Sequence, residues 1–165
     1  MYATAGTCGL VVTATWLPLT VAWPSPRFTD NLDGTVTDNL TGLIWMKVAN
    51  CLGQRTWEDA LSGCKLLADG LCMLTDGSSA GDWRLPNRRE LLSLIHDDYR
   101  GPAVPNTAGT GQWSYDDPFL YVQSYIYWSS NTSGSSAWFV NMSSGQVHTA
   151  YKVHEHWAWP VRGGH

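Results

Sequence analysis

The chain has 165 residues, a formal net charge of −4 and only 15% charged residues, with ten Trp, seven Tyr and sixteen Gly, a composition typical of one loop-rich β or α+β domain. The acidic balance excludes nucleic acid as a partner, because binding to a phosphate backbone depends on clustered Lys and Arg. The sequence contains no run of 18 or more apolar residues, so no membrane-spanning helix is expected.

The chain begins with an apolar segment, residues 9–23, which no basic residue precedes, unlike the hydrophobic core of a signal peptide. Within it Val12, Ala14 and Trp16 alternate with threonines, and this alternation predicts a β-strand. Such a strand can pair within the domain or add to the sheet edge of a neighbouring copy.

A hairpin and a buried strand are expected next. Residues 27–38, "RFTDNLDGTVTD", have the pattern of a β-hairpin in which Asp33 and Gly34 supply the turn. The acidic residues lack the spacing of a calcium-binding loop, so a turn is favoured over a calcium site. Residues 42–48, "GLIWMKV", are typical of a buried strand.

The first helix is predicted over residues 56–70, "TWEDALSGCKLLADG". Thr56 is placed to cap its N-terminus together with Asp59, and Gly70 is placed to end it. The apolar residues of this segment fall on one helical face. Cys64 lies on that face, so its thiol is expected to point inward.

The second helix is predicted in residues 81–95, "GDWRLPNRRELLSLI". Pro86 keeps the entry extended, Asn87 caps the helix, and Glu90 completes a capping box three residues later. The expected buried stripe consists of Leu91, Leu94 and Ile95. The two adjacent arginines in the first turn face outward, and they are too few to read nucleic acid on an acidic protein.

The second half of the chain is predicted to be a loop followed by short strands. Residues 100–118 are rich in Pro, Gly, Thr and Asp and predict a long surface loop. From Tyr125 onward the strand patterns are "YIYWSS", "SAWFVNM", "GQVHTAYK" and "HEHWAWPVR", with a hairpin loop at residues 143–145. The sequence therefore predicts an α+β fold with two helices packed on short antiparallel sheets and many loops.

An even number of cysteines in a chain with few charges favours disulfides and an extracytoplasmic location. No C-x-x-C motif occurs and no His lies near the cysteines, unlike a zinc site. The residues are Cys8, Cys51, Cys64 and Cys72. Spacing alone leaves all three pairings open.

Several motifs in order resemble those of a known family. They are "FTDNLDGTVTDNLTGLIWMK", "W..AL", "GDWRLPNRRELLSLI", "YWSS" and "WPVRGG". Together they resemble the bacterial DUF1566 domains, the group that includes the C-terminal domain of the Legionella collagen-like adhesin. The resemblance implies a DUF1566 domain over residues 24–165, with residues 1–23 as an extension outside it.

That family in turn resembles the C-type lectin-like fold, in the branch related to the formylglycine-generating enzyme. The resemblance implies framework roles, rather than binding roles, for the residues that match its fixed positions. These are Trp83, Arg84, Pro86, Asn87, Trp128 and Arg162. It also implies a Cys51–Cys72 disulfide, which leaves Cys8 and Cys64 as the second pair.

The resemblance places ligand binding on the late strands and loops of the domain. Some related domains are diversified there by retroelements, and the polar and aromatic residues between the fixed positions are similar to those of an antibody paratope. An ordinary polar strand surface is the alternative. The predicted contact residues are Asn131, Ser133, Ser135, Trp138, Phe139, Asn141, His148, Tyr151, His154, His156 and Trp157.

Three other chemistries receive less support. The calcium-dependent sugar motifs of lectins do not occur, and all four cysteines precede residue 73, whereas the formylglycine-generating branch uses a late cysteine pair. We therefore expect no enzymatic activity and no cofactor. His148, His154 and His156 have a spacing that would allow convergence on zinc or copper, but polar surface is the preferred interpretation.

These patterns predict a secreted or cell-surface domain that binds a protein or glycan ligand on another cell or surface. The main alternative is a structural subunit that forms a homo-oligomer or filament through residues 9–23. A formylglycine-generating type of enzyme is a remote alternative.

Overall fold

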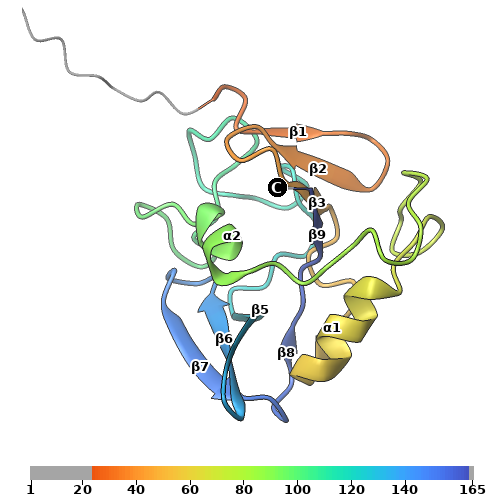
Figure 1. Ribbon diagram of the computed structural model, residues 1–165. Coiled ribbons are helices and arrows are strands. Elements are labelled where there is room, and N and C mark those ends of the chain that lie inside the picture. Colours follow the sequence, from red (N-terminus) through yellow and green to blue (C-terminus); the bar gives the residue numbers. More distant parts are fainter. Residues whose placement is uncertain (1–23, 164–165) are drawn as a thin grey trace, which may run out of the picture.

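The computed structural model describes residues 24–163, which form an α+β fold with two sheets and two helices (Figure 1). The first sheet has four antiparallel strands in the order β1-β2-β3-β9. Its strands are β1 (Phe28–Asp30), β2 (Thr35–Asp38), β3 (Ile44–Met46) and β9 (Val161–Arg162). The last strand of the domain thus lies beside the third, which closes the fold.

The second sheet has five strands in the order β4-β8-β5-β6-β7. They are β4 (Gln54–Arg55), β8 (His156–Trp157), β5 (Ile126–Ser133), β6 (Ser136–Asn141) and β7 (Val147–Tyr151). The pair β5–β8 is parallel and the other pairs are antiparallel. The prediction of antiparallel sheets is therefore correct except at this one junction.

The predicted first hairpin is confirmed. Asp33 Oδ1 accepts hydrogen bonds from the backbone N–H and the hydroxyl of Thr35, at 3.0 and 2.6 Å. Gly34 has a φ of +84°, and a Cβ at this position would lie 2.3 Å from the Met73 carbonyl oxygen. The turn therefore needs glycine both for its conformation and for space.

The final pattern "HEHWAWPVR" was expected to be one strand, and this expectation is wrong. It is divided into β8 in the second sheet and β9 in the first. Pro160 stands between them and has no N–H to donate to a ladder. Its carbonyl accepts a hydrogen bond from Met46 N–H at 3.1 Å, so the chain crosses to β3 at this residue.

Helix α1 (Trp57–Lys65) begins as predicted, with Thr56 accepting a hydrogen bond from Asp59 N–H. It ends five residues before Gly70, contrary to prediction. Leu67 N–H donates a hydrogen bond to the Cys64 carbonyl in a tighter turn, and Gly81 N–H donates one to the Lys65 carbonyl. The helix C-terminus is thus satisfied by tertiary partners that the local sequence does not show.

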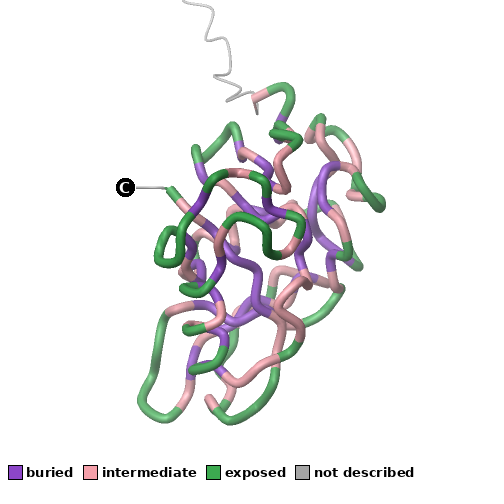
Figure 2. The backbone as a smooth tube through the Cα atoms, turned by 90° about the vertical axis from the view of Figure 1, so that its right-hand side faces the viewer, coloured by how far each residue is buried: buried purple, intermediate pink, exposed green. Residues whose placement is uncertain are grey.

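Helix α2 (Arg88–Ser93) has the predicted capping box between Asn87 and Glu90. Leu91 and Leu94 are fully buried, while Ile95 is half-buried. The main core contains Trp45, Trp83 and Trp159, and buried segments of the chain run through the middle of the domain (Figure 2). None of the helices in residues 24–163 has the length and apolar character that crossing a membrane requires.

Cys51 and Cys72 form the disulfide that the family resemblance implied, with their Cα atoms 5.8 Å apart. Cys64 is a free thiol and is completely buried, so the expected Cys8–Cys64 bridge is wrong. Its side chain packs with Trp57 and Leu85 in a second core cluster, and burial raises its pKa to about 12. Cys8 itself lies outside the described residues.

Replacing both Cys51 and Cys72 with Ser is expected to lower the free energy of unfolding by about 3 kcal/mol, since the bridge closes a loop across a separation of 21 residues. Urea unfolding followed by tryptophan fluorescence measures this loss. A reducing agent should destabilise the natural chain by a similar amount and leave the double variant unchanged. Equal stability of the oxidised natural chain and the double variant would contradict the prediction.

Candidate ligand-binding groove

The strands β5, β6 and β7 present two different faces, because side chains alternate along each strand. Cross-strand pairing places Trp128 beside Phe139, and Phe139 beside His148, in one row. The neighbouring row, on the opposite face, packs into the main core and consists of Tyr127, Val140 and Val147. The row that carries Phe139 packs partly into the second core cluster with Trp57 and Leu85, and Phe139 also lines the groove on this face.

A groove of about 550 Å³ lies on these strands. Its lining comes from β5, β6 and β7, from the turn after β7 and from β8. The lining residues are Ile126, Ser136, Phe139, Thr149, Ala150, Tyr151, His154 and His156. Four of them are predicted contact residues, drawn from three separate segments of the chain.

Aromatic and imidazole rings surround the groove. Tyr151 and His154 are perpendicular with ring centroids 5.8 Å apart, and His154 lies 6.4 Å from His156. Phe139 lies 5.9 Å from His156 and is only 8% exposed, whereas Tyr151 is 61% exposed. The groove therefore has a fixed apolar floor and an accessible aromatic rim.

His156 is held by its neighbours rather than by hydrogen bonds. Its ring packs edge-on against Trp128 at 4.6 Å, and both ring nitrogens are shielded from solvent without a hydrogen-bond partner among the described residues. Burial lowers the pKa of His156, and the nearby charge of His154 lowers it further. The imidazole is consequently neutral at pH 7.

Among residues 24–163, no Asp, Glu, Lys or Arg lines the groove. The lining instead supplies hydroxyl groups from Ser136, Thr149 and Tyr151 beside aromatic surface. Such a lining suits an uncharged ligand that stacks on rings and exchanges hydrogen bonds with hydroxyl or amide groups.

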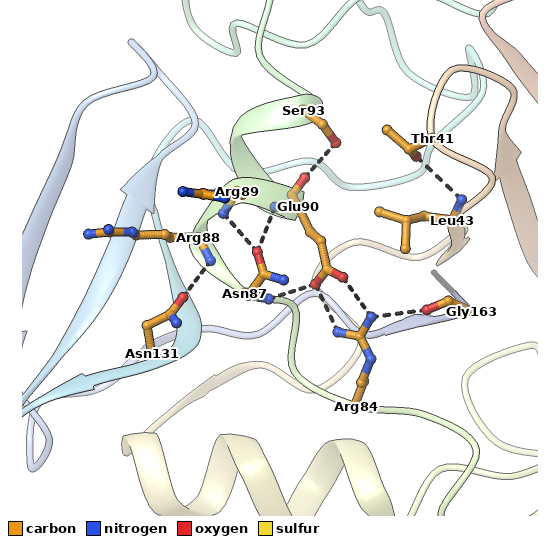
Figure 3. Close-up of polar contacts among 10 residues, drawn as sticks. All are labelled: Thr41, Leu43, Arg84, Asn87, Arg88, Arg89, Glu90, Ser93, Asn131 and Gly163. Atoms are coloured by element: carbon orange, nitrogen blue, oxygen red, sulfur yellow. Dashed lines mark hydrogen bonds and ion pairs between the residues drawn. The ribbon is translucent and has the colours of Figure 1, made fainter. Parts of the chain in front are cut away.

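Asn131 and Trp138 lie elsewhere, against helix α2. The Arg88 guanidinium lies 4.8 Å from the centre of the Trp138 ring, and Arg88 N–H donates to Asn131 Oδ1 at 2.8 Å (Figure 3). Trp138 neighbours Phe139 in a strand, so its side chain takes the opposite face. These two residues attach α2 to the sheet, and they do not join the groove.

The remaining predicted contact residues also lie outside the groove lining. Ser133 and Ser135 are exposed in the β5–β6 hairpin, and Asn141 accepts a hydrogen bond from Ser143 N–H in the next turn. Trp157 packs against the main core, and His148 lies beside Phe139 with ring centroids 6.2 Å apart. The structure thus divides the predicted set into a groove group and peripheral residues.

The three histidines do not converge. His154 and His156 are neighbours at the groove, whereas His148 contacts Phe139 in the cross-strand row. Within residues 24–163, no group of three or more His, Cys, Asp or Glu side chains has an arrangement that could hold a metal ion.

Residues Ile126, Ser136, Thr149 and Ala150 line the groove but were not predicted. Thr149 could have been predicted from the sequence, because it lies between two predicted contact residues in a strand with exposed positions. Ser136 is found only through its pairing with Tyr151 across the two strands. Ile126 and Ala150 look like ordinary strand residues in the sequence.

The framework motif around residues 83–90 connects helix α2 to this sheet. Arg84 makes two hydrogen bonds to the Glu90 carboxylate, at 2.8 and 2.6 Å, and a third to the Gly163 carbonyl at 3.0 Å (Figure 3). The Pro86 carbonyl accepts a hydrogen bond from Ser130 N–H in β5. The helix start, the last strand and β5 are thereby tied together.

The other framework residues are also engaged in packing. Trp83 is fully buried and donates to the Ser78 hydroxyl at 3.1 Å. Arg162 lies 5.2 Å over the Trp83 ring and 3.0 Å from the carboxylate of Asp76. Trp128 is fully buried and donates to the Arg55 carbonyl at 3.0 Å. Their roles are structural.

Comparison with known proteins agrees with the motifs described above. The family described as the Lcl C-terminal domain, which is the DUF1566 family, matches residues 34–162, most of the chain. A comparison with curated proteins gives no match. The matched region contains both helices, the disulfide and every residue that lines the groove. The chain therefore belongs to the Lcl C-terminal domain family, whose members include an adhesin-like type of surface domain.

Proposed function

We propose that this domain is an extracellular, non-enzymatic binding module that attaches a bacterial surface protein to a protein or glycan ligand through the groove. The observation that carries the proposal is the groove itself, which brings Phe139, Tyr151, His154 and His156 together from β6, β7 and the segment that follows. Concave sites with aromatic walls and a few polar groups are the usual form of binding sites.

The chemistry of the groove supports recognition rather than catalysis. Tyrosine and histidine rings give contact area at a low entropic cost, and the hydroxyl groups add hydrogen bonds that can adapt to a ligand. Cys64, the free thiol among the described residues, is completely buried and does not line the groove. Nothing in the lining resembles an activated nucleophile with its base.

An extracellular location is supported by the Cys51–Cys72 disulfide, because such bonds persist in oxidising compartments. We further infer the C-type lectin-like architecture. Its support is the pairing of the last strand, β9, with β3 in the first sheet, with two helices on the sheets and binding on the late strands. A protein of this design positions a binding surface on a rigid framework.

The proposal predicts that Tyr151→Ala and His154→Ala each weaken binding of a captured ligand by about tenfold or more, since accessible aromatic residues dominate binding energy at such sites. The measurement is a screen of the full chain against immobilised glycans and cell-surface proteins, followed by titration of the positives. Both side chains are exposed, so the fold should be retained.

Tyr125→Ala is the matched control, because this tyrosine is 53% exposed and does not line the groove. It should bind like the natural chain. If the ligands found in the screen bind equally well to the Tyr151, His154 and Tyr125 variants, the groove is not the binding site.

A further inference from the structure

Strand β7 is an edge of the five-stranded sheet, and β6 is its neighbour on one side only. Figure 1 shows β7 at the outer side of the molecule, with no described strand beyond it. An edge strand presents a row of unpaired backbone groups that can pair with another chain. The backbone groups of β7 that face outward decide whether such pairing is possible.

The hydrogen bonds at the two ends of β7 fix this orientation. Asn141 N–H donates to the Gln146 carbonyl at 2.8 Å, and Lys152 N–H donates to the Ser135 carbonyl at 3.2 Å. In an antiparallel pair the hydrogen-bonded residues alternate, so residues 146, 148, 150 and 152 bond toward β6. Residues 147, 149 and 151 consequently direct their backbone groups away from the sheet.

These outward groups are largely unpaired. Among residues 24–163, the one hydrogen bond to them is that from His154 N–H to the Tyr151 carbonyl, at 3.0 Å. Both backbone groups of Val147 and of Thr149, and the Tyr151 N–H, therefore form an open edge. Its length matches a partner strand of about five residues.

The other sheet edges are protected differently. In the first sheet, β9 exchanges hydrogen bonds of 3.0 Å in both directions between Val161 and Arg84. On the opposite side of that sheet, Phe28 N–H in β1 donates to the Thr107 carbonyl. In the second sheet the far edge is β4, which has only two residues. Strand β7 has neither Pro nor Lys nor a bulge, the usual means of blocking an edge.

The chain contains a segment with the chemistry of a partner strand. Residues 10–16, "LVVTATW", lie outside the described residues and carry no charge, and within them Val12, Ala14 and Trp16 alternate with Thr13 and Thr15. Such residues favour pleated strands. Strand β7 likewise contains no Asp, Glu, Lys or Arg, and its residues His148, Thr149 and Tyr151 are exposed.

The distance between the start of the described chain and β7 favours a second copy, rather than the same copy, as the source of this segment. The described chain begins at residue 24 beside β1, at the top of Figure 1, whereas β7 lies at the lower left. We propose that residues 10–16 of one copy add to the outer edge of β7 in a second copy as a sixth strand. The added strand would lie in the plane of the sheet, so the groove on its face stays open for a ligand.

The test uses three variants of the full chain. Thr149→Pro removes one outward N–H without touching the bonds to β6, since proline is tolerated at such edge positions. Thr13→Pro disrupts the donor segment, which lies outside the described fold. Thr149→Val keeps both the N–H and the β-branched shape and is the matched control for the first variant.

The measurement is light scattering across a concentration series. The natural chain and the Thr149→Val variant should associate, and each proline variant should associate at least tenfold more weakly. A mixture of the two proline variants should form pairs and no larger species, because one retains the donor segment and the other retains the acceptor edge.

Hydrogen–deuterium exchange covers the case in which Thr149→Pro fails to fold. The amides of Thr149 and Tyr151 should be protected in the natural chain and should exchange at least tenfold faster in Thr13→Pro. A monomeric natural chain overturns the proposal, whether or not these amides are protected. Binding of groove ligands by Thr13→Pro is expected to be unchanged, so failure here is distinguishable from failure of the proposed function.

Discussion

Replacing Asp38 with Ala is expected to lower the free energy of unfolding by about 3–5 kcal/mol, because it leaves a buried guanidinium without its counter-ion. Asp38 is 0% exposed and Arg27 is 1% exposed. The Arg27 Nε and Nη2 atoms donate to the two carboxylate oxygens at 2.9 and 2.8 Å. The same carboxylate accepts bonds from Leu40 N–H and the Thr41 hydroxyl, so the β2–β3 turn loses its support as well.

Equilibrium unfolding in urea measures this loss. The control is Asp98→Ala, because Asp98 is 85% exposed and its oxygen is 3.8 Å from His96, so its removal should leave the midpoint almost unchanged. Replacing Arg27 with Met and Asp38 with Leu together should lower the free energy of unfolding less than Asp38→Ala alone, since neither charge of this pair then remains buried. A double variant less stable than the single variant would contradict this account.

Replacing Trp159 with Ala is expected to lower the free energy of unfolding by about 3–5 kcal/mol, as for other large residues removed from a core. Trp159 is fully buried, and its ring lies 4.9 Å from that of Phe119 and 5.6 Å from those of Trp45 and Tyr127. Its Nε1–H also donates to the Met46 carbonyl at 2.8 Å. The variant therefore loses both a cluster of ring contacts and the bond that links residue 159 to β3.

Trp159→Phe separates these contributions, because it keeps most of the apolar volume and removes the hydrogen bond. We expect about half the loss seen with Ala. Trp138→Ala is the control, since Trp138 is half-buried on the face that contacts α2 and should cost clearly less. Equal losses of unfolding free energy for Trp138→Ala and Trp159→Ala in denaturant would contradict the prediction that the core position of Trp159 makes it more important for stability.

The elements that the sequence predicted correctly are those with strong local chemistry. The turn at Asp33 and Gly34, the Thr56 cap and the Asn87–Glu90 capping box each depend on residues within a few positions of one another. Their side chains satisfy backbone groups in any context, so they act before tertiary packing forms. The order of motifs along the chain also identified the family.

The end of α1, the division of residues 154–162 between two sheets, and the free Cys64 were not predictable in the same way. Each depends on a partner that is distant in the sequence, such as Gly81 for the Lys65 carbonyl or the main-chain groups of Met46 for residues 159 and 160. Local propensity carries no information about such partners. The inward position of Cys64 on α1 was predicted from the helical pattern, whereas its lack of a disulfide partner depends on how the chain packs around it.

The candidate site shows the same division. The family resemblance indicated that the late strands carry polar and aromatic residues suited to binding, and four of the eight residues that line the groove were among those predicted. Only the tertiary structure decided which of them meet, because strand register brings Tyr151 beside Ser136 and His148 beside Phe139. The sequence determines the chemistry of each side chain, whereas the groove forms only when the strands pair in a fixed register.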